Sequence, residues 1–319
     1  MSGLAVVVLN YNDYDNTSAQ VERILGYSVV NEIIVVDNCS PDRSGVRLSR
    51  AAAHWNAAEE RKGRGRRVAV LCAGRNGGYG AGNNLGLHYA ARQGMRHALI
   101  ANPDTRFSEA LLRAMLAVFS EAERRIERGE DTAPLGAISA RMQDRQHGRQ
   151  QSAWPIRGFL GELLNSGPLC RRLFRPFLNY PESLFRGGKI CAGQRLIEVS
   201  VLHGSLLMLN IDAFWQSGGY DERIFLYGEE NILARRLRAA GFRSGLLPEQ
   251  SYFHENGGST EKSYQALLPR QRLRQRSERY YYRQYLRIGT AAELLTLLFQ
   301  GVVLLETAAA DLWKRSGSD

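Results

Sequence analysis

Short apolar runs alternate with helical patterns through the first third of the chain. Runs rich in Val, Ile, Leu and Ala lie within residues 4–9, 32–37, 67–71 and 97–101. Continuous apolar runs of this length are typical of strands that are buried on both faces. Helices are expected between and after them, with Asn16 or Thr17 capping the first helix and Ser108 capping the last. Strands that alternate with helices at this spacing predict an α/β fold with a mainly parallel sheet.

The second half of the chain has a less regular pattern. A fifth strand is expected over residues 136–142, but residues 143–195 show no clear period and are rich in Gly, Pro, Arg and aromatic residues. A long irregular stretch of this kind is usually a functional loop, so we predict a mobile basic segment. The remaining expected elements are strands over 198–202, 206–209 and 244–248 and a helix over 211–217.

Two adjacent carboxylates, Glu229 and Glu230, begin another predicted helix. Apolar residues follow at helical spacing, and Gly241 is expected to end the helix. The helix dipole stabilises acidic residues at a helix N-terminus, so the pair alone needs no functional explanation. Its meaning depends on the polar residues elsewhere in the chain.

Polar turns follow the predicted strands. Residues 10–13 (Asn-Tyr-Asn-Asp) and 37–41 come directly after the first two strands, and the carboxyl ends of parallel strands form the ligand face of such a sheet. Asp104 follows the fourth strand, where a carboxylate could hold a divalent cation that bridges phosphates, or could belong to a turn that merely ends the strand. A lone histidine such as His254 is more often structural than a ligand.

Residues 75–86 form a glycine-rich loop that leads into a helix. Small residues at such a junction let backbone N–H groups approach a phosphate. The spacing does not match the dinucleotide-binding fingerprint, because Asn83 or Leu85 stands where the last glycine should be, and no Gly-Lys-Ser/Thr follows as in a P-loop. The loop by itself is therefore a weak functional signal.

The C-terminal part combines many arginines and tyrosines with an uncharged apolar stretch over 294–305. That stretch is too short to span a bilayer, and it fits a helix lying in a membrane interface. Packing on the core or on a second subunit is equally open. Stacking of nucleic-acid bases on the tyrosines ranks last, because no nucleic-acid-binding motif accompanies them, and no nucleic-acid partner is predicted.

Composition narrows the partners and the compartment. The 319 residues include 42 Lys+Arg against 32 Asp+Glu, a net charge of +10, which suggests an anionic ligand or surface. The four cysteines show no CxxC spacing, so reduced thiols are expected rather than a zinc site or a disulfide framework. An apolar run begins directly after residue 3, which leaves no room for a signal peptide, and a cytoplasmic protein is expected.

Taken in order, these motifs resemble glycosyltransferase family 2, whose members are inverting enzymes with the GT-A fold. The similarity is greatest to rhamnosyltransferase-like bacterial enzymes of cell-surface polysaccharide synthesis, and it covers residues 4–259. It rests on the motifs at 7–12, 35–40, 76–84, 102–104, 218–222 and 225–230, and on His254 with Gly258 and Ser259. The resemblance implies a catalytic domain over 1–262, with 143–195 on the acceptor side, and a basic, amphipathic helical region over 263–319.

The resemblance also implies roles for individual residues. Glu230 matches the general base, with Glu229 as the second candidate. Asp104 matches the last residue of the family's D-x-D motif, and His254 the histidine that completes a site for Mg²⁺ or Mn²⁺. His203 and Gly204 match the strand end that faces the acceptor. The nucleotide-sugar would be held by Asn10, Asn12, Asp37, Asn76, Gly78, Asn83 and Asn102.

Three positions depart from the family's usual pattern. Asn102 stands where the first Asp of D-x-D often stands, Glu230 replaces the commoner Asp, and Ile232 occupies a position often held by Asp. Inverting transfer still has the residue types it needs. A carboxylate takes the proton of the attacking acceptor hydroxyl, and a cation neutralises the departing diphosphate.

The resemblance favours dTDP-rhamnose as the donor and a saccharide or lipid-linked saccharide as the acceptor, at the inner face of the cell membrane. Two other functions stay open. A sugar nucleotidyltransferase would normally carry an N-terminal glycine-rich loop with Lys or Arg, whereas the first strand here ends in Asn10-Tyr11-Asn12. A catalytically degenerate module would bind nucleotide-sugar or glycan without turnover.

Overall fold

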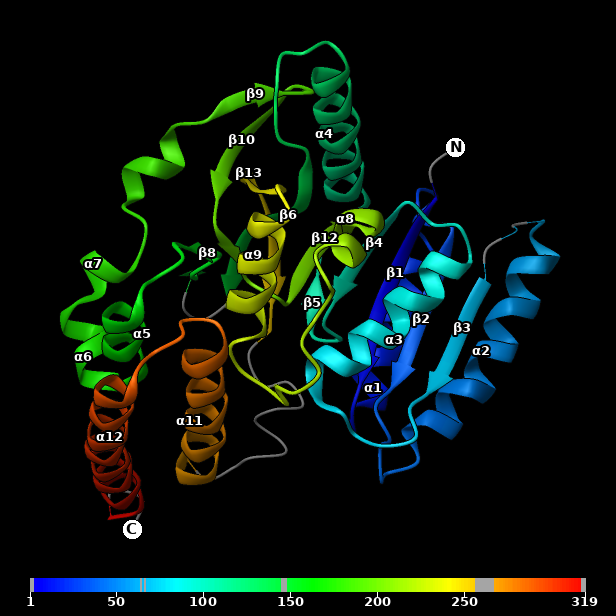
Figure 1. Cartoon of the computed structure of the whole chain (residues 1–319). Helices are drawn as coiled ribbons and strands as arrows, with labels where there is room; N and C mark the ends of the chain where they lie inside the picture. Colours follow the sequence, from blue (N-terminus) through cyan, green and yellow to red (C-terminus); the bar gives the residue numbers. More distant parts are fainter. Residues whose placement is uncertain (1–2, 64, 66, 145–147, 256–266, 317–319) are drawn as a thin grey trace.

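The computed structural model describes residues 3–63, 65, 67–144, 148–255 and 267–316. In these residues a central sheet of 11 strands begins with four parallel strands in the order β3-β2-β1-β4 (Figure 1). Their bounds are Leu4–Asn10 for β1, Glu32–Asp37 for β2, Arg67–Cys72 for β3 and His97–Ala101 for β4. The parallel sheet predicted from the apolar runs is therefore confirmed.

The other half of the sheet is mixed. β12 (Leu206–Asn210) runs antiparallel to both β4 and β6 (Leu135–Asp144), and β13 (Arg243–His254) runs parallel to β6. The expected strand over 244–248 is longer than predicted, because the pairing with β6 breaks between Leu247 and Ser251 and then continues to Phe253. Pro248 lies in this break. The apolar pattern in the sequence ended at this proline, but the strand continues past it.

Shorter strands complete the sheet and its edge. β10 (Gln194–Val199) and β9 (Lys189–Cys191) extend it antiparallel, β5 (Thr105–Arg106) pairs with the end of β13, and β7 (Gly148–Arg149) pairs with β6. A separate pair joins β8 (Ala153–Trp154) to β11 (Val201–Leu202). The two-residue strand β5 has the largest consequence for function, as shown below.

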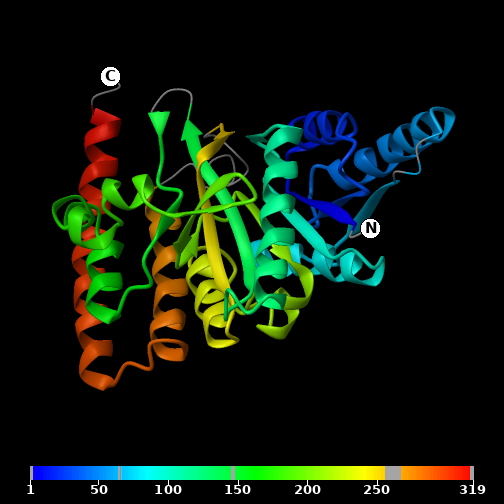
Figure 2. The same ribbon diagram turned by 90° about the horizontal axis from the view of Figure 1, so that it is seen from above.

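Helices cover both faces of the sheet (Figures 1 and 2). One core contains apolar residues of α1 (Tyr14–Ile24), α2 (Ser44–Arg61) and α4 (Glu109–Glu127), and the other contains residues of α3 (Gly78–Arg92), α8 (Ile211–Gln216) and α9 (Glu229–Ala239). In β1, Leu4, Val6 and Val8 enter the first core, whereas Ala5 and Val7 enter the second. This two-sided burial explains the uninterrupted apolar run.

The predicted helix caps were right in one place and wrong in another. Ser108 accepts a hydrogen bond from the Leu111 N–H at 3.2 Å, which confirms it as the cap of α4. α1 begins at Tyr14, before Asn16 and Thr17, so neither residue is its cap. The Thr17 hydroxyl instead donates to Asn10 Oδ1 at 2.8 Å. Thr17 therefore ties α1 to the end of β1.

The segment 143–195 is more ordered than we expected. It contains three short helices and a 3₁₀ turn: α5 (Phe159–Ser166), α6 (Pro168–Leu173), α7 (Arg175–Leu178) and η1 (Glu182–Arg186). Each is too short to leave a clear helical period in the sequence, so the prediction of an irregular segment is wrong.

The C-terminal region forms two helices, α11 (Leu267–Gln284) and α12 (Thr290–Ser316), at the end of the molecule opposite α2 (Figure 2). On α11, Tyr281 and Tyr282 join an apolar cluster with Leu163 of α5 and Ile232 of α9. Of the interpretations left open, packing on the core therefore holds for α11. The predicted domain boundary at 262 and the motif residues Gly258 and Ser259 lie outside the described residues.

The helix α12 buries several polar side chains and exposes many of its apolar side chains. Thr296 and Gln300 are 2% exposed, whereas Leu298 and Leu305 are 72% and 73% exposed. The stretch Thr290–Ala309 has a mean hydropathy of 1.5 and, by length and composition alone, is long enough to cross a membrane. Our expectation that the apolar stretch is too short was wrong, because it counted only the residues between two charges.

Candidate active site

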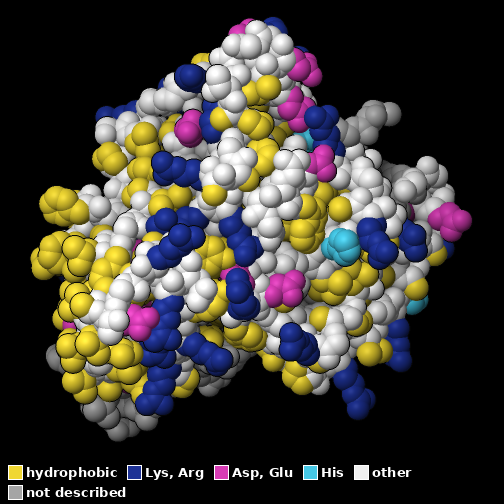
Figure 3. Space-filling model, in the orientation of Figure 1, with side chains coloured by type: hydrophobic (Ala, Val, Ile, Leu, Met, Phe, Trp, Pro, Cys, Tyr) yellow, Lys and Arg dark blue, Asp and Glu magenta, His cyan; other side chains and the backbone are white. Residues whose placement is uncertain are grey.

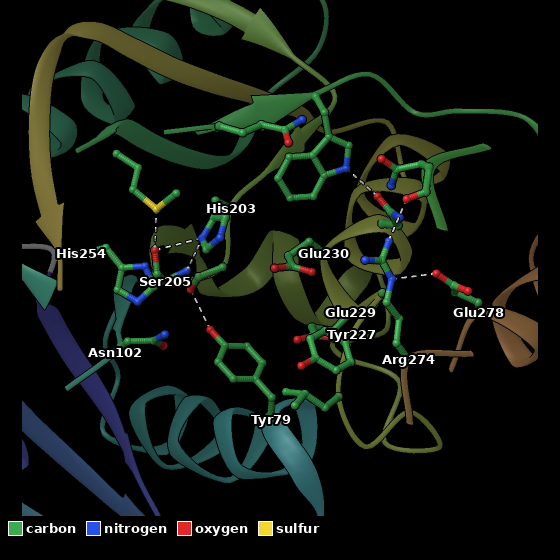
Figure 4. Close-up of a pocket in the computed structure, with 18 of the residues that line it drawn as sticks. Tyr79, Asn102, His203, Ser205, Tyr227, Glu229, Glu230, His254, Arg274 and Glu278 are labelled. Carbon is green, nitrogen blue, oxygen red and sulfur yellow. Dashed lines mark hydrogen bonds and ion pairs between the residues drawn. The ribbon is translucent and has the colours of Figure 1, made fainter. Parts of the chain in front are cut away.

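A cavity of about 600 Å³ opens where the loops after β1 and β4 meet α9 and α11 (Figure 4). Its lining brings together segments from across the chain, as the motifs predicted. Seven of the predicted site residues line it: Asn102, Asp104, His203, Gly204, Glu229, Glu230 and His254.

The strand β5 places Asp104 beside His254. Thr105 pairs with His254 across the antiparallel ladder, and the Glu255 N–H donates to the Asp104 carbonyl at 2.9 Å. Arg106 and Glu255 form a bidentate ion pair that reinforces the same junction. Two residues far apart in sequence are thereby held with His254 Nε2 3.2 Å from Asp104 Oδ1.

This pair fits part of the shell of a divalent cation. Adjacent ligands of an octahedral ion with bonds of about 2.1 Å lie about 3 Å apart, close to the observed 3.2 Å. A carboxylate oxygen with an imidazole nitrogen suits Mn²⁺ better than Ca²⁺. Among the described residues no third His, Cys, Asp or Glu joins them, so diphosphate oxygens and water would have to complete the shell.

The two carboxylates occupy the first turn of α9, as predicted, and Gly241 follows its end with a φ of 86°. The chain reaches α9 through two left-handed residues, Tyr227 and Gly228, with φ of 71° and 93°. This turn lets Glu229 fold back towards backbone N–H groups while Glu230 points into the cavity (Figure 4). Both carboxylates line the cavity, and the sequence indicated the helix start but not how their hydrogen bonds would differ.

Their surroundings give the two carboxylates different properties. Burial and the neighbouring Glu230 raise the pKa of Glu229 well above 4.5, and its Oε2 has no hydrogen-bond partner among the described residues. Burial also raises the pKa of Glu230, although the Gly204 N–H donates to this carboxylate and opposes the shift. Glu230 is therefore a carboxylate with increased basicity at the cavity surface, which is what a general base requires.

A hydrogen-bonded chain fixes the strand end opposite Glu230. The Tyr79 hydroxyl donates to the Gly204 carbonyl at 2.7 Å, and the N–H of the same residue, Gly204, faces Glu230. His203 Nδ1 accepts from the Ser205 N–H, and the Ser205 hydroxyl lies 2.8 Å from the Tyr252 hydroxyl. Sequence analysis did not identify Tyr79, Ser205 or Tyr252, although Tyr79 lies in the glycine-rich motif.

The predicted nucleotide-binding residues lie elsewhere, with Asn102 as the exception. Asn10 is fully buried, and its Nδ2 donates to Asp37 Oδ1 at 2.7 Å and to Ser44 Oγ at 2.8 Å. These contacts connect β1, β2 and the start of α2, so any effect of Asn10 on a ligand would pass through Asp37. The other residues of this set outside the cavity lining are Asn12, Asp37, Asn76, Gly78 and Asn83. Their binding role stays a prediction.

The glycine-rich motif, which we expected to be a loop, lies mostly in α3, and its composition has a packing reason. A side chain at Gly78 would meet the Phe225 carbonyl oxygen at 2.0 Å, and one at Gly82 would meet Leu9 Cδ1 at 2.3 Å. Gly78 also has a φ of 87°, which favours glycine. The small residues therefore bring α3 close to β1 and to the segment that precedes α9, and the sequence-based expectation of phosphate binding is not required to explain them.

The far half of the cavity contains residues that sequence analysis did not predict. Trp154 of β8 lies at its wall, and its Nε1 donates to Asn231 Oδ1 at 2.8 Å. The charged residues of this half come from the segment 143–195 and from α11: Arg157, Glu162, Arg171, Arg270, Arg274 and Glu278. The C-terminal region is thus a wall of the site, and no sequence motif signalled this.

The raised pKa of Glu230 predicts the acid limb of the pH profile. A general base acts only when deprotonated, so if Glu230 has that role, kcat/KM should fall as the pH drops through the pKa of Glu230. Because burial raises that pKa above 4.5, we expect the midpoint of the acid limb above pH 4.5. The measurement is kcat/KM against pH at saturating metal. A midpoint below 4.5, or the same limb in Glu230→Gln, would contradict the assignment.

Known proteins are similar to this chain over most of its length. Residues 5–216 match the family model of Glycosyl transferase family 2. The chain is 24% identical over 273 residues to the low-salt glycan biosynthesis hexosyltransferase Agl10 of Haloferax volcanii, covering 84% of this chain and 73% of that protein. It is 29% identical over 164 residues to the N-acetylglucosaminyl-diphospho-decaprenol L-rhamnosyltransferase of Mycobacterium tuberculosis, covering 51% of this chain and 48% of that one.

Among solved structures, the chain is similar to the mannosyltransferase PcManGT from Pyrobaculum calidifontis in complex with GDP-Man and Mn²⁺. The TM-score is 0.52 at 14% sequence identity, over 99% of this chain and 75% of that one. Identity this low bears on the fold alone, which is the GT-A fold. The family model covers more than half of the sequence, and it includes the Asp104 motif. The chain belongs to glycosyl transferase family 2.

Proposed function

We propose that this protein is a metal-dependent inverting glycosyltransferase that uses Glu230 as its general base. The observation that carries the proposal is that Glu230 and the pair Asp104–His254 line one cavity. A base for the acceptor and a cation site for the leaving diphosphate are the two groups that this reaction needs.

The residues divide the reaction between them. The acceptor hydroxyl would lie against Glu230, which takes its proton as oxygen attacks the anomeric carbon and the bond to the diphosphate breaks. The Gly204 N–H donates to Glu230, and the Tyr79 hydroxyl donates to the Gly204 carbonyl. Together these hydrogen bonds fix the position of the base. Asp104 and His254 would hold Mg²⁺ or Mn²⁺, which supplies positive charge to the departing diphosphate. Burial of Glu230 raises its basicity.

For the donor we favour dTDP-rhamnose, and for the acceptor a saccharide, in particular one linked to a lipid. The support is the motif resemblance and the likeness to a protein named as a rhamnosyltransferase acting on N-acetylglucosaminyl-diphospho-decaprenol. A hexose donor is the alternative, because the other relative is named as a hexosyltransferase. A role in the synthesis of a cell-surface polysaccharide follows from such an acceptor.

A panel of nucleotide-sugars tests the proposal. The melting temperature of the full chain is measured with each donor, with and without Mn²⁺, since a ligand that binds only the folded state raises it. The donor with the largest shift is then assayed for release of nucleoside diphosphate. Release of pyrophosphate from a sugar phosphate and a nucleoside triphosphate would indicate a nucleotidyltransferase instead. Binding without turnover, with every acceptor tried, would indicate a degenerate binding module.

We also propose that α12 binds the surface of an anionic membrane. Its outward side chains are apolar, and Figure 3 shows this hydrophobic area beside a row of Lys and Arg at the lower left. Its buried polar side chains already pair inside the protein, as when Gln300 Nε2 donates to the Gln275 carbonyl. Apolar side chains beside basic ones favour anionic lipid over neutral lipid.

Replacing the outward leucines tests this contact. The double variant Leu298→Ser, Leu305→Ser should lose most of its binding to phosphatidylglycerol vesicles, because each substitution removes an exposed apolar side chain from the lipid-facing side. Binding is measured by vesicle flotation. Leu85→Ser, at an exposed leucine of α3, is the matched control and should bind like the wild type. If the wild type is a dimer and the double variant is a monomer, a second subunit covers α12.

A further inference from the structure

The far half of the cavity carries more positive than negative charge. Four arginines line it, against two glutamates. Burial raises the pKa of Glu162 to about 7 and also raises that of Glu278, so the glutamates only partly offset the arginines. Uncompensated positive charge in a partly buried site is costly, and an anionic ligand would relieve it.

Some polar groups of this half already have hydrogen-bond partners in the described chain, and others are left for such a ligand. Arg157 Nε donates to the Leu178 carbonyl, and Arg274 Nε donates to Glu278 Oε1 at 2.8 Å. Arg171 makes no side-chain hydrogen bond with any residue that the structure describes. The Tyr282 hydroxyl, on a residue that is 1% exposed, also has no partner in the described chain. Both residues line the cavity.

Exposed apolar side chains on α6 lie next to Arg171. Arg171 lies on α6 between Leu169 and Leu173, which are 63% and 74% exposed. Gly167, at the start of α6, packs against Val303 and Phe299 of α12. The outward apolar side chains of α6 and α12 therefore lie on neighbouring helices (Figures 1 and 3).

We propose that Arg171 and Tyr282, with Arg274 beside them, bind a phosphate or diphosphate that links the acceptor sugar to an apolar chain. The apolar chain leaves the cavity over α6 and α12. This inference rests on the proposed function, and it adds the subsite that recognises the acceptor. Arginine and tyrosine N–H and O–H groups are suited to phosphate oxygens.

The arrangement in Figure 4 fits two separate anions. His254 and Asn102 lie on one side of Glu230, and Arg274 lies on the other. The donor diphosphate would occupy the side of Asp104 and His254. An acceptor whose hydroxyl lies against Glu230 would direct its own phosphate to the opposite side. Each substrate thus has its own cationic partner, and the base lies between them.

A binding experiment on the full chain tests the subsite without knowledge of the acceptor sugar. The probes are farnesyl diphosphate, farnesol and inorganic diphosphate, measured by titration calorimetry. Farnesyl diphosphate should bind the tightest, and Arg171→Gln and Tyr282→Phe should each weaken it about tenfold, as expected for a lost hydrogen bond to a charged group. Arg172→Gln is the matched control, because Arg172 is the next arginine on α6 and, unlike Arg171, does not line the cavity.

Several outcomes would overturn the proposal. If Arg172→Gln weakens farnesyl diphosphate as much as Arg171→Gln does, the effect is only surface charge. If Arg171→Gln weakens the nucleotide-sugar instead, the arginine serves the donor. If Arg171→Gln lowers binding to phosphatidylglycerol vesicles and leaves farnesyl diphosphate unchanged, the anion is a membrane headgroup.

A kinetic comparison separates this inference from the proposed function. The acceptors are an alkyl-diphosphate-linked N-acetylglucosamine and the alkyl glycoside without phosphate. Arg171→Gln should raise KM for the first about tenfold at unchanged kcat, and should leave both constants for the second unchanged. Equal effects on both acceptors would reject the subsite while the transferase stands. A wild type that neither transfers nor hydrolyses any donor would reject the function, and the calorimetry would still decide the subsite.

Discussion

Glu230→Gln is expected to lower kcat about a thousandfold, because removal of a general base typically costs a factor of 10² to 10⁴. Glutamine keeps the size of the side chain and an oxygen that can accept from the Gly204 N–H. It cannot take the proton of an acceptor hydroxyl. Binding of the nucleotide-sugar should change little, because Glu230 lies apart from His254 (Figure 4), which contacts Asp104. The measurements are single-turnover transfer and donor affinity by calorimetry.

Glu229→Gln is the matched control, since it makes the same chemical change one residue earlier. Burial and the neighbouring Glu230 raise the pKa of Glu229 well above 4.5, which favours the protonated form, and glutamine resembles that form. We expect a rate close to that of the wild type. Normal turnover in Glu230→Gln together with loss in Glu229→Gln would transfer the role of base to Glu229. Loss in both variants would indicate that the pair acts as a unit.

The fold was predictable where one sequence pattern had one structural cause. The runs at β1 and β2 could only be strands with both faces buried, and Ser108 could cap only the helix that follows it. The prediction of elements failed where the sequence pattern was interrupted or too short. Pro248 ended the apolar pattern, but a break in pairing lets β13 pass through it. The helices α5, α6 and α7 are too short to show a period.

The site was predictable as a set of motifs and not as a geometry. Asp104, His254 and Glu230 do line one cavity, as the order of motifs implied. Asn10 and Asp37 belong to other motifs of the same set, yet they form a hydrogen bond with each other inside the fold. A motif records that residues occur together, and it does not distinguish a ligand contact from a contact that shapes the loop. The arginines of α6 and α11 belong to no motif, so only the packing of those helices against the cavity revealed them.

Loss of the cation site is the second large effect that we expect. His254→Ala and Asp104→Asn should each reduce kcat/KM about 100-fold, because each removes one of the two residues that we propose as ligands of a cation, and the cation stabilises the charge of the leaving diphosphate. Wild-type activity should disappear when EDTA removes the metal and return with Mn²⁺ or Mg²⁺. The measurement is kcat/KM against metal concentration, and each variant should need more metal for half-maximal rate.

The pair also connects β5 to β13, so a structural effect must be separated from a loss of metal. The melting temperature with donor and Mn²⁺ does this, because a bound ligand raises it by mass action. The wild type should show a shift that depends on Mn²⁺, and the variants should not, even if their melting temperatures without ligand are unchanged. His54→Ala and Asp15→Asn change exposed residues of α2 and α1 and serve as controls. If His254→Ala keeps the shift and the rate of the wild type, the contact between Asp104 and His254 is only an ion pair that joins two strands, and the diphosphate must be stabilised by other residues.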